Sequence, residues 1–357
     1  MIVEERDLSG NPAGNTTADF FYHIATYFVV MTYTIAISQA DFPNANTELE
    51  VFELADEDIA VTVGSAESEA ELIELASGAD GLLVQYAQVT ESVFEQLPEL
   101  SVVSRYGIGV DNIDVEAATE HGVAVTHVPS YCEEEVATHA ISLLMTLVRK
   151  TSRYDREVKS GNWDWKIGRP IEPLTGKTVG FAAFGKIPRT FAKLLDGFDL
   201  EYLTYDPYLS EEDVADHSVE LVSFETLLAE SDVISIHAPL VKETRHLFDA
   251  DAFRQMKDSA FLLNTARGPI VDEDALNEAL LADEIAGVGV DVMKEEPTHE
   301  SPLFEREDTV VTPHVAWYSE SSLTELRQKA AENLVRYLHG EAPHGFVNES
   351  SVSLPDK

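Results

Sequence analysis

The chain has 357 residues, with 65 Asp and Glu against 24 Lys and Arg, so its net charge is −41 and its pI is about 4.4. The acidic residues are spread along the chain and repel phosphate groups, which argues against nucleic acid and anionic membrane surfaces as partners. A hydrophobic fraction of 44% is enough for a packed core, and this length favours two domains.

The charge and the cysteine content also indicate the environment of the protein. Many like charges repel one another in dilute buffer and are screened in concentrated salt, a balance typical of halophilic proteins. The single cysteine, Cys132, excludes an internal disulfide and is typical of a reducing cytoplasm. We therefore expect a salt-adapted cytoplasmic protein in which Cys132 has no redox role.

Residues 1–32 fit poorly with the rest of the chain. A polar, turn-rich stretch is followed by FFYHIATYFVV, which is too short to span a bilayer. It also lacks the basic flank and the small-residue cleavage site of a signal peptide. We expect residues 1–32 to be an extension outside the fold.

Residues 33–126 alternate strand-like and helix-like patterns. The strand-like segments are YTIAIS, DIAVTV, GLLVQ, SVVSRY and VAVTH. Between them, ESEAELIELASG and TESVFEQL have helical spacing, with Glu67 and Thr90 near their starts. The alternation predicts a small parallel α/β domain. RYGIGVDNID follows one of these strands, and its glycines allow backbone amides to approach a ligand closely.

A long helical pattern covers residues 131–161, and we interpret it as the helix that joins the two domains. We expect His139 on this helix to pack or to face solvent. The connector that follows, residues 162–177 with the sequence NWDWKIGRPIEPLTGK, is rich in Trp, Pro and Gly. The apolar positions on one side of the helix are Val136, Ala137, Ala140, Leu143, Leu144 and Leu147.

The stretch from residue 177 to residue 208 predicts the strand, turn, helix and strand of a dinucleotide site. Aligned on Gly-x-Gly-x-x-Gly, its three positions are Ala183, Gly185 and Pro188, so only the glycine that admits the pyrophosphate remains. A proline is tolerated in the first helical turn, where its missing N–H costs no hydrogen bond.

The carboxylate of Asp206 supports the same interpretation and selects the cofactor. It follows Gly185 by 21 residues, at a position that accepts from ribose hydroxyls and repels a 2′-phosphate. The sequence therefore predicts NAD as the cofactor, with Gly185, Lys186 and Ile187 forming the phosphate-binding turn.

Three polar side chains stand at the ends of later apolar runs: Arg267 after FLLNTA, Glu296 after GVGVDVMKE and His314 after TVVTP. Such runs are typical of buried parallel strands, and ligands bind at the carboxyl ends of these strands. The guanidinium group can grip a carboxylate, and the imidazole can move a proton near neutral pH. The carboxylate can orient the imidazole and favour its charged form. We therefore expect the three residues to act on a 2-keto or 2-hydroxy acid.

These motifs resemble those of a known family. NTARG, D-V-x-x-x-E-P and TPH, in that order, resemble the signature of the NAD-dependent D-isomer-specific 2-hydroxyacid dehydrogenases. PHVAWYSE and RYGIGVDNID resemble the C-terminal binding protein branch in particular, and the match covers roughly residues 33–347. The resemblance implies an α/β fold with a flavodoxin-like substrate domain, formed by residues 33–130 and 320–347, and a Rossmann NAD-binding domain, residues 131–319. The helical pattern after Ser319 is then expected to return to the first domain.

The resemblance also implies further binding residues. It places the substrate carboxylate against the backbone amides of Ile108 and Gly109, with Arg105 beside them. Because Trp317 follows His314 by three residues, we expect it to form one wall of the substrate pocket. The remaining residues for which the resemblance implies cofactor contacts are His237, Ala238, Pro239, Thr244, Thr265, Ala266 and Asp291.

The sequence thus predicts an NAD-dependent oxidoreductase that interconverts a 2-keto acid and a D-2-hydroxy acid. The resemblance further implies a homodimer to which the connector contributes. Two alternatives remain open: a phosphoglycerate dehydrogenase, although the substrate domain shows no basic cluster for a phosphate, and an NAD(H)-sensing scaffold that docks peptides. We expect no metal site, because no Cys/His cluster occurs.

Overall fold

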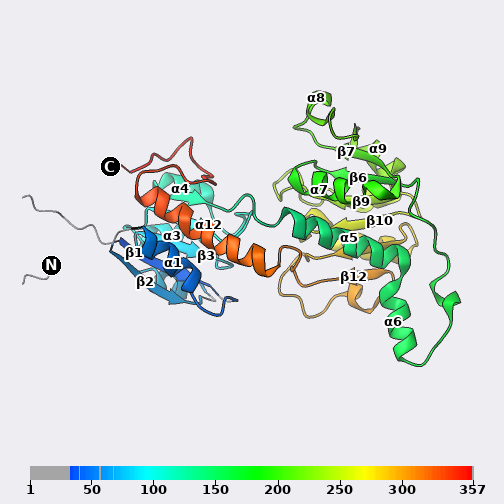
Figure 1. Cartoon of the computed structure of the whole chain (residues 1–357), viewed down its shortest axis with the longest axis horizontal. Helices are drawn as coiled ribbons and strands as arrows, with labels where there is room; N and C mark the ends of the chain where they lie inside the picture. The colour runs from blue at the N-terminus through cyan, green and yellow to red at the C-terminus, as the bar shows by residue number, and fades with distance from the viewer. Residues whose placement is uncertain (1–32, 40, 56–57, 67, 356–357) are drawn as a thin grey trace, which may run out of the picture.

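The computed structural model describes residues 33–39, 41–55, 58–66 and 68–355, so the prediction for residues 1–32 lies outside the described residues. Two parallel sheets organise this part of the chain and lie towards opposite ends of the elongated molecule (Figure 1). Among the described residues, no helix combines the length and the apolar character needed to cross a bilayer.

The first sheet has five strands in the order β2-β1-β3-β4-β5, which is the flavodoxin-like order. All five predicted strands are confirmed. Glu67 lies outside the described residues, and the side chain that caps the second helix is Ser68, whose hydroxyl accepts from the Glu71 amide. The bounds are β1 (Tyr33–Ser38), α1 (Asn46–Leu54), β2 (Ile59–Gly64), α2 (Glu69–Leu75), β3 (Gly81–Val84), α3 (Glu91–Gln96), β4 (Val102–Arg105), α4 (Val115–Glu120) and β5 (Ala124–Thr126).

The helix α12 (Glu320–Leu338) returns to this sheet and packs along it, as Figure 1 shows. Its buried apolar residues share one core with β1, β3 and β4, which confirms the predicted return. This face of the helix includes Leu326, Ala330, Leu334 and Leu338.

The second sheet has seven strands in the order β12-β11-β10-β9-β6-β7-β8, a Rossmann order with one further strand. Its elements are β6 (Thr178–Ala182), α7 (Lys186–Leu194), η2 (Asp196–Phe198), β7 (Glu201–Tyr205), α8 (Glu211–Val214), β8 (Glu220–Leu221), α9 (Phe224–Glu230), β9 (Val233–Ile236), α10 (Ala250–Gln255), β10 (Phe261–Asn264), η3 (Gly268–Ile270), α11 (Glu273–Leu281), β11 (Gly287–Val290), η4 (Pro302–Glu305) and β12 (Thr309–Val311).

The long helical pattern of residues 131–161 forms two helices, so the prediction of one continuous helix is wrong. The first, α5 (Glu133–Arg149), buries all six predicted apolar positions and packs on the second sheet. Lys150 then takes a left-handed conformation with φ 51°, and α6 (Thr151–Lys159) leaves in a new direction. Because α6 buries no residue, no packing holds it in line with α5. The short helix η1 (Trp165–Gly168) follows in the connector.

Candidate active site

His314 and Glu296 form a hydrogen-bonded pair at the carboxyl end of the second sheet. Nδ1 of His314 lies 2.6 Å from Oε2 of Glu296, and the other carboxylate oxygen accepts from the Met293 amide at 2.8 Å. His314 has a φ of 53°, in the region that favours glycine, so its orientation is held by the surrounding turn. Among the described residues, Nε2 of His314 has no hydrogen-bond partner.

The surroundings of Glu296 keep its carboxylate ionised. Burial opposes ionisation, but the hydrogen bond and charge of His314 and the Met293 amide hold the pKa of Glu296 below its ordinary value. An ionised Glu296 accepts a hydrogen bond from Nδ1–H of His314, which leaves Nε2 to donate when the imidazole is charged and to accept when it is neutral.

Arg267 links the loop after β10 of the second sheet to the loop after β4 of the first. It precedes η3, and its Nε donates to both carboxylate oxygens of Asp111, each at 3.2 Å, in the loop after β4. Nη1 donates to the Ala266 carbonyl at 2.7 Å. Nη2 lies against Gly109, where an added β-carbon would come within 1.8 Å of it and displace the guanidinium group. The sequence did not indicate Asp111 as a partner.

Arg105 approaches the same loop from the end of β4. Its Nη1 would lie 1.3 Å from a β-carbon added to Gly107, which has a φ of 144°. Its Nε is buried and has no partner among the described residues. Burial, and then the charge of Arg267, lower the pKa of Arg105. Two guanidinium groups therefore converge on the loop of Gly107 and Gly109, an arrangement suited to a carboxylate.

Trp317 and Ile108 flank this region. The indole of Trp317 is partly buried and donates to the His314 carbonyl at 3.0 Å, so it braces the histidine turn. Ile108 is exposed, and its carbonyl lies 2.5 Å from Nδ1 of His127. The structure therefore brings together all the residues predicted to bind substrate, while their roles stay predictions.

The predicted nucleotide turn joins β6 to α7. Ala183 adopts a φ of 74°, so it reproduces the left-handed backbone of the missing first glycine at a cost of about 1 kcal/mol. Gly185 caps α7 without a side-chain hydrogen bond, and a β-carbon there would meet nothing within 4 Å. The turn is therefore open, and the free amides of α7 can receive a phosphate.

Asp206 lies beside this turn, at the end of β7. Its carboxylate accepts from the amides of Phe184 at 3.1 Å and Tyr208 at 3.0 Å, which fixes its direction. Thr265 directly follows β10 in the same sheet, and its hydroxyl is buried without a partner in the described chain. A ribose acceptor, an open glycine turn and an unpaired hydroxyl all fit a dinucleotide such as NAD.

His237 turns its side chain into the protein. Its ring lies 6.0 Å from that of Phe181 and 6.5 Å from that of Phe191, and Nε2 lies 2.9 Å from the Ser235 hydroxyl. Burial lowers the pKa of His237 to about 3, so this side chain is neutral at pH 7. Of the two residues that follow, Ala238 is buried and Pro239 is exposed.

The other predicted cofactor residues lie around the same strand ends. Thr244 donates to the Pro239 carbonyl at 2.6 Å and so closes the loop after β9. Lys186 is largely exposed and lies 3.6 Å from Glu133. Ile187 packs partly into the core beneath α7, Ala238 is buried, and Ala266 is held by Asn264 at 3.0 Å.

Asp291 differs from the expected nicotinamide contact, because its carboxylate is enclosed. The residue is 1% exposed and accepts from the Thr312 hydroxyl at 2.6 Å, the Val315 amide at 3.0 Å and the Ala316 amide at 2.8 Å. His139 adds a contact at 2.9 Å to the Thr312 hydroxyl. Asp291 and His139 thus support the turn that carries His314, a role that the sequence did not reveal.

Cys132 caps α5 and is buried, and burial raises the pKa of its thiol to about 12. It is therefore a protonated, unreactive thiol at neutral pH. Within the described ranges, no group of His, Cys, Asp and Glu side chains could hold a metal ion.

Comparison with known proteins agrees with this geometry. The family model for the NAD-binding domain of D-isomer specific 2-hydroxyacid dehydrogenases matches residues 141–316. The glyoxylate reductase of Korarchaeum cryptofilum is 37% identical over 290 residues, which cover 79% of this chain and 87% of that protein. The D-3-phosphoglycerate dehydrogenase of Archaeoglobus fulgidus is 37% identical over 298 residues, which cover 83% of this chain but 56% of that protein.

A solved structure matches over nearly its whole length. The D-lactate dehydrogenase of Aquifex aeolicus, complexed with NAD and lactic acid, has a TM-score of 0.77 to this chain at 28% identity. The match covers 88% of this chain and 98% of that one.

Proposed function

Because this chain belongs to the D-isomer specific 2-hydroxyacid dehydrogenase family, we propose that His314, Glu296 and Arg267 catalyse its NAD-dependent interconversion of a 2-keto acid and a D-2-hydroxy acid. The observation that carries this proposal is the contact of 2.6 Å between Nδ1 of His314 and Glu296, with no partner for Nε2 in the part of the chain that the structure describes. NAD, when bound, carries the hydride.

The residues of the protein bind the substrate and transfer one proton. Arg267 and Arg105 bind the substrate carboxylate, together with the amides of Ile108 and Gly109. During reduction, charged His314 donates its Nε2 proton to the carbonyl oxygen, and Glu296 stabilises the charge on the imidazole beforehand. During oxidation, neutral His314 accepts that proton from the hydroxyl group.

We further propose that the substrate is small, of the size of glyoxylate or pyruvate. The two guanidinium groups at the site converge on one loop, which suits one carboxylate better than a carboxylate and a separate phosphate. The relatives named glyoxylate reductase match along most of their length, whereas the chain spans about half of the phosphoglycerate relative. Assays of glyoxylate, pyruvate, hydroxypyruvate and phosphohydroxypyruvate with NADH test this proposal. Preference for the phosphorylated substrate would reverse the assignment.

We keep the placement in the C-terminal binding protein branch as a proposal. It is supported by RYGIGVDNID and PHVAWYSE, which contribute Arg105 and Trp317 to the site. A peptide-docking scaffold is the second candidate function. Failure of folded, NADH-bound protein to reduce any acid of a broad panel would favour the scaffold over the enzyme.

Asp206 is expected to make NADH the preferred cofactor. Its fixed carboxylate would lie near a 2′-phosphate and repel it. Replacing Asp206 by Ala should therefore narrow the difference in Kd between NADH and NADPH, as measured by fluorescence titration. Tighter binding of NADPH than of NADH by the unmodified protein would contradict this expectation.

We also propose that the protein is salt-adapted and cytoplasmic, as its acidity and single cysteine suggest. At about 0.01 M salt the screening length is roughly 30 Å, so many of the 65 acidic side chains repel at once. The melting temperature should therefore rise from dilute buffer to molar KCl. A melting temperature that does not change with KCl would exclude salt adaptation.

The connector supports a proposed homodimer. Its residues Trp163 and Trp165 are 87% and 67% exposed, which is unusual for side chains of this size. A second copy would cover them. Sedimentation should give a mass of two chains, and replacing Trp163 and Trp165 by Ser should shift it towards one. A single-chain mass for the unmodified protein would contradict the dimer.

A further inference from the structure

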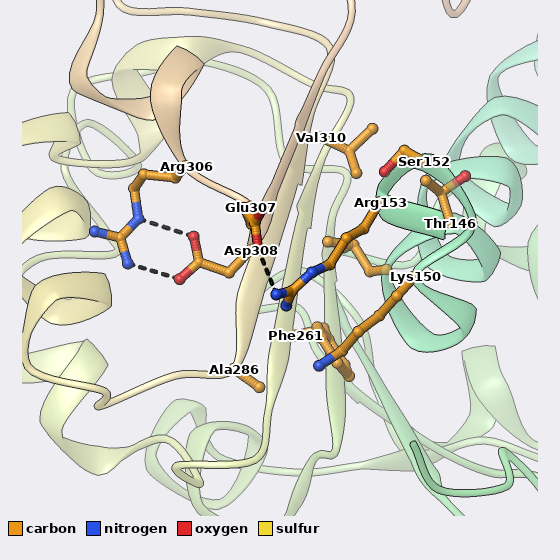
Figure 2. A pocket seen from close by; sticks show the side chains of 11 residues that line it. Thr146, Lys150, Ser152, Arg153, Phe261, Ala286, Arg306, Glu307, Asp308 and Val310 are labelled. Atoms are coloured by element: carbon orange, nitrogen blue, oxygen red, sulfur yellow. Dashed lines mark hydrogen bonds and ion pairs between the residues drawn. The ribbon is translucent and has the colours of Figure 1, made fainter. Parts of the chain in front are cut away.

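A cavity of about 360 Å³ lies at the end of the second sheet opposite to the candidate active site (Figure 2). Strands β10, β11 and β12 begin beside it, and the chain reaches Arg267, Asp291 and His314 only after their carboxyl ends. The C-terminal end of α5 and the start of α6 close the cavity on the other side. It is therefore separated from the proposed substrate and cofactor sites by the length of the strands.

Three basic side chains line this cavity: Lys150, Arg153 and Arg306. Two carboxylates, Glu307 and Asp308, line the same cavity, so the lining carries one more positive than negative charge. Arg306 pairs with Asp308 through two hydrogen bonds, which Nε and Nη2 donate at 2.8 Å and 2.6 Å. Asp308 is thereby neutralised.

The other two cations retain unused hydrogen-bond donors. Arg153 uses Nη2 in an ion pair with Glu307 at 2.8 Å, but its buried Nε has no partner among the described residues. Lys150 forms no ion pair within the described part of the chain. Figure 2 shows the ends of both side chains pointing into the same space. A buried donor without an acceptor costs free energy, and an acceptor bound in the cavity would remove this cost.

The backbone adds positive potential at the same place. Helix α6 begins directly after Lys150, no side chain caps it, and Ser152 of its first turn lines the cavity. The free amides and the dipole of a helix start favour an anion. The floor includes Phe261 and Val310, so the cavity offers cationic donors on one side and apolar surface on the other.

We propose that this cavity binds a small oxyanion, a carboxylate or phosphate group, between Lys150, Nε of Arg153 and the start of α6. The apolar floor would receive the remainder of an organic ligand. The net charge of −41 opposes the approach of any anion at long range, but concentrated salt screens that repulsion more than it screens contacts inside a cavity. Binding should therefore be measurable at high ionic strength.

Calorimetric titration with inorganic phosphate tests the proposal in the full-length chain carrying Arg267→Gln. This background removes one arginine of the active site, and the titration is run with saturating NADH, which occupies the phosphate-binding turn before α7. Phosphate binding that Lys150→Gln or Arg153→Gln then weakens arises in the cavity. We expect one phosphate per chain at constant ionic strength. Adding Lys150→Gln or Arg153→Gln should weaken binding by about tenfold or more, the loss of one charge-assisted hydrogen bond.

Lys159→Gln is the matched control, because Lys159 lies on the same helix, outside the cavity, and pairs with Asp155 at 2.7 Å. It removes the same charge and should leave phosphate affinity unchanged. Absence of saturable binding, or equal weakening by all three substitutions, would overturn the proposal. A lack of phosphate binding, together with dissociation of a two-chain assembly by Lys150→Gln, would also overturn the proposal, because the cavity would then be a subunit contact.

Discussion

Replacing His314 by Ala should lower kcat for keto-acid reduction by roughly 10²–10⁴, the contribution of a positioned proton donor. The reason lies in the contact at 2.6 Å between Nδ1 of His314 and Glu296, which orients the imidazole and leaves proton transfer to Nε2. The imidazole of His237 is not placed to take over, because its ring is packed among Phe181 and Phe191 and burial keeps it neutral.

Substrate binding should respond differently to the variants of this site. Arg267 carries the carboxylate grip and remains intact in His314→Ala, so KM should change far less than kcat. Arg267→Ala should instead raise KM and lower kcat together, because its charge acts on both bound states. The matched control is His299→Ala, an exposed histidine near Glu296. A kcat for His314→Ala close to that of the control would contradict the assignment.

The fold and the meeting of His314 with Glu296 could be predicted because they depend on local patterns. Buried parallel strands are short apolar runs, and residues that directly follow such runs meet at one edge of the sheet. This reasoning needs no knowledge of distant contacts. It placed Arg267, Glu296 and His314 together although 47 residues separate the first from the last.

Contacts between distant charges could not be predicted in the same way. Arg267 pairs with Asp111 at a separation of 156 residues, and Arg327 pairs with Glu48 at a separation of 279. With 65 acidic residues available, no spacing distinguishes the true partner of an arginine from the others. These pairs depend on how the two sheets and α12 pack, which is information beyond any local pattern.

Unusual backbone conformations explain why some local predictions from the sequence were wrong or incomplete. The long helix ends at Lys150, whose backbone is left-handed. Lysine rarely adopts this conformation, and the glycine or proline that usually indicates a helix end is absent there. Ala183 takes a similar conformation in the nucleotide turn, which explains how the turn survives without its first glycine. The amides of Val315 and Ala316, which donate to Asp291, lie 24 and 25 residues further along the chain, so no local pattern indicated them; its nicotinamide contact stays a prediction. Sequence indicates residue chemistry better than the direction in which each side chain points.

Replacing Arg327 by Ala should lower the free energy of unfolding by about 3–5 kcal/mol, the cost of leaving a buried charge without its partner. Glu48 is fully buried, and the Arg327 side chain is 7% exposed. Nε and Nη2 of Arg327 donate to the two carboxylate oxygens of Glu48 at 2.9 Å and 2.6 Å, and Nη2 also donates to the Asn44 carbonyl. The substitution would leave Glu48 with only the hydroxyl of Tyr106 as a donor.

Urea unfolding at constant salt measures this loss, and Arg336→Ala is the matched control on the same helix. Arg336 pairs with Glu341 at 3.3 Å near the surface, so its removal should cost no more than about 1 kcal/mol. Combining Arg327→Ala with Glu48→Gln should recover part of the stability, because no unpaired charge then stays buried. Equal losses of unfolding free energy for Arg327→Ala and Arg336→Ala would show that burial of the ion pair does not determine the cost of removing it. The Arg327 effect should persist in molar KCl, since salt screens buried pairs much less than exposed ones.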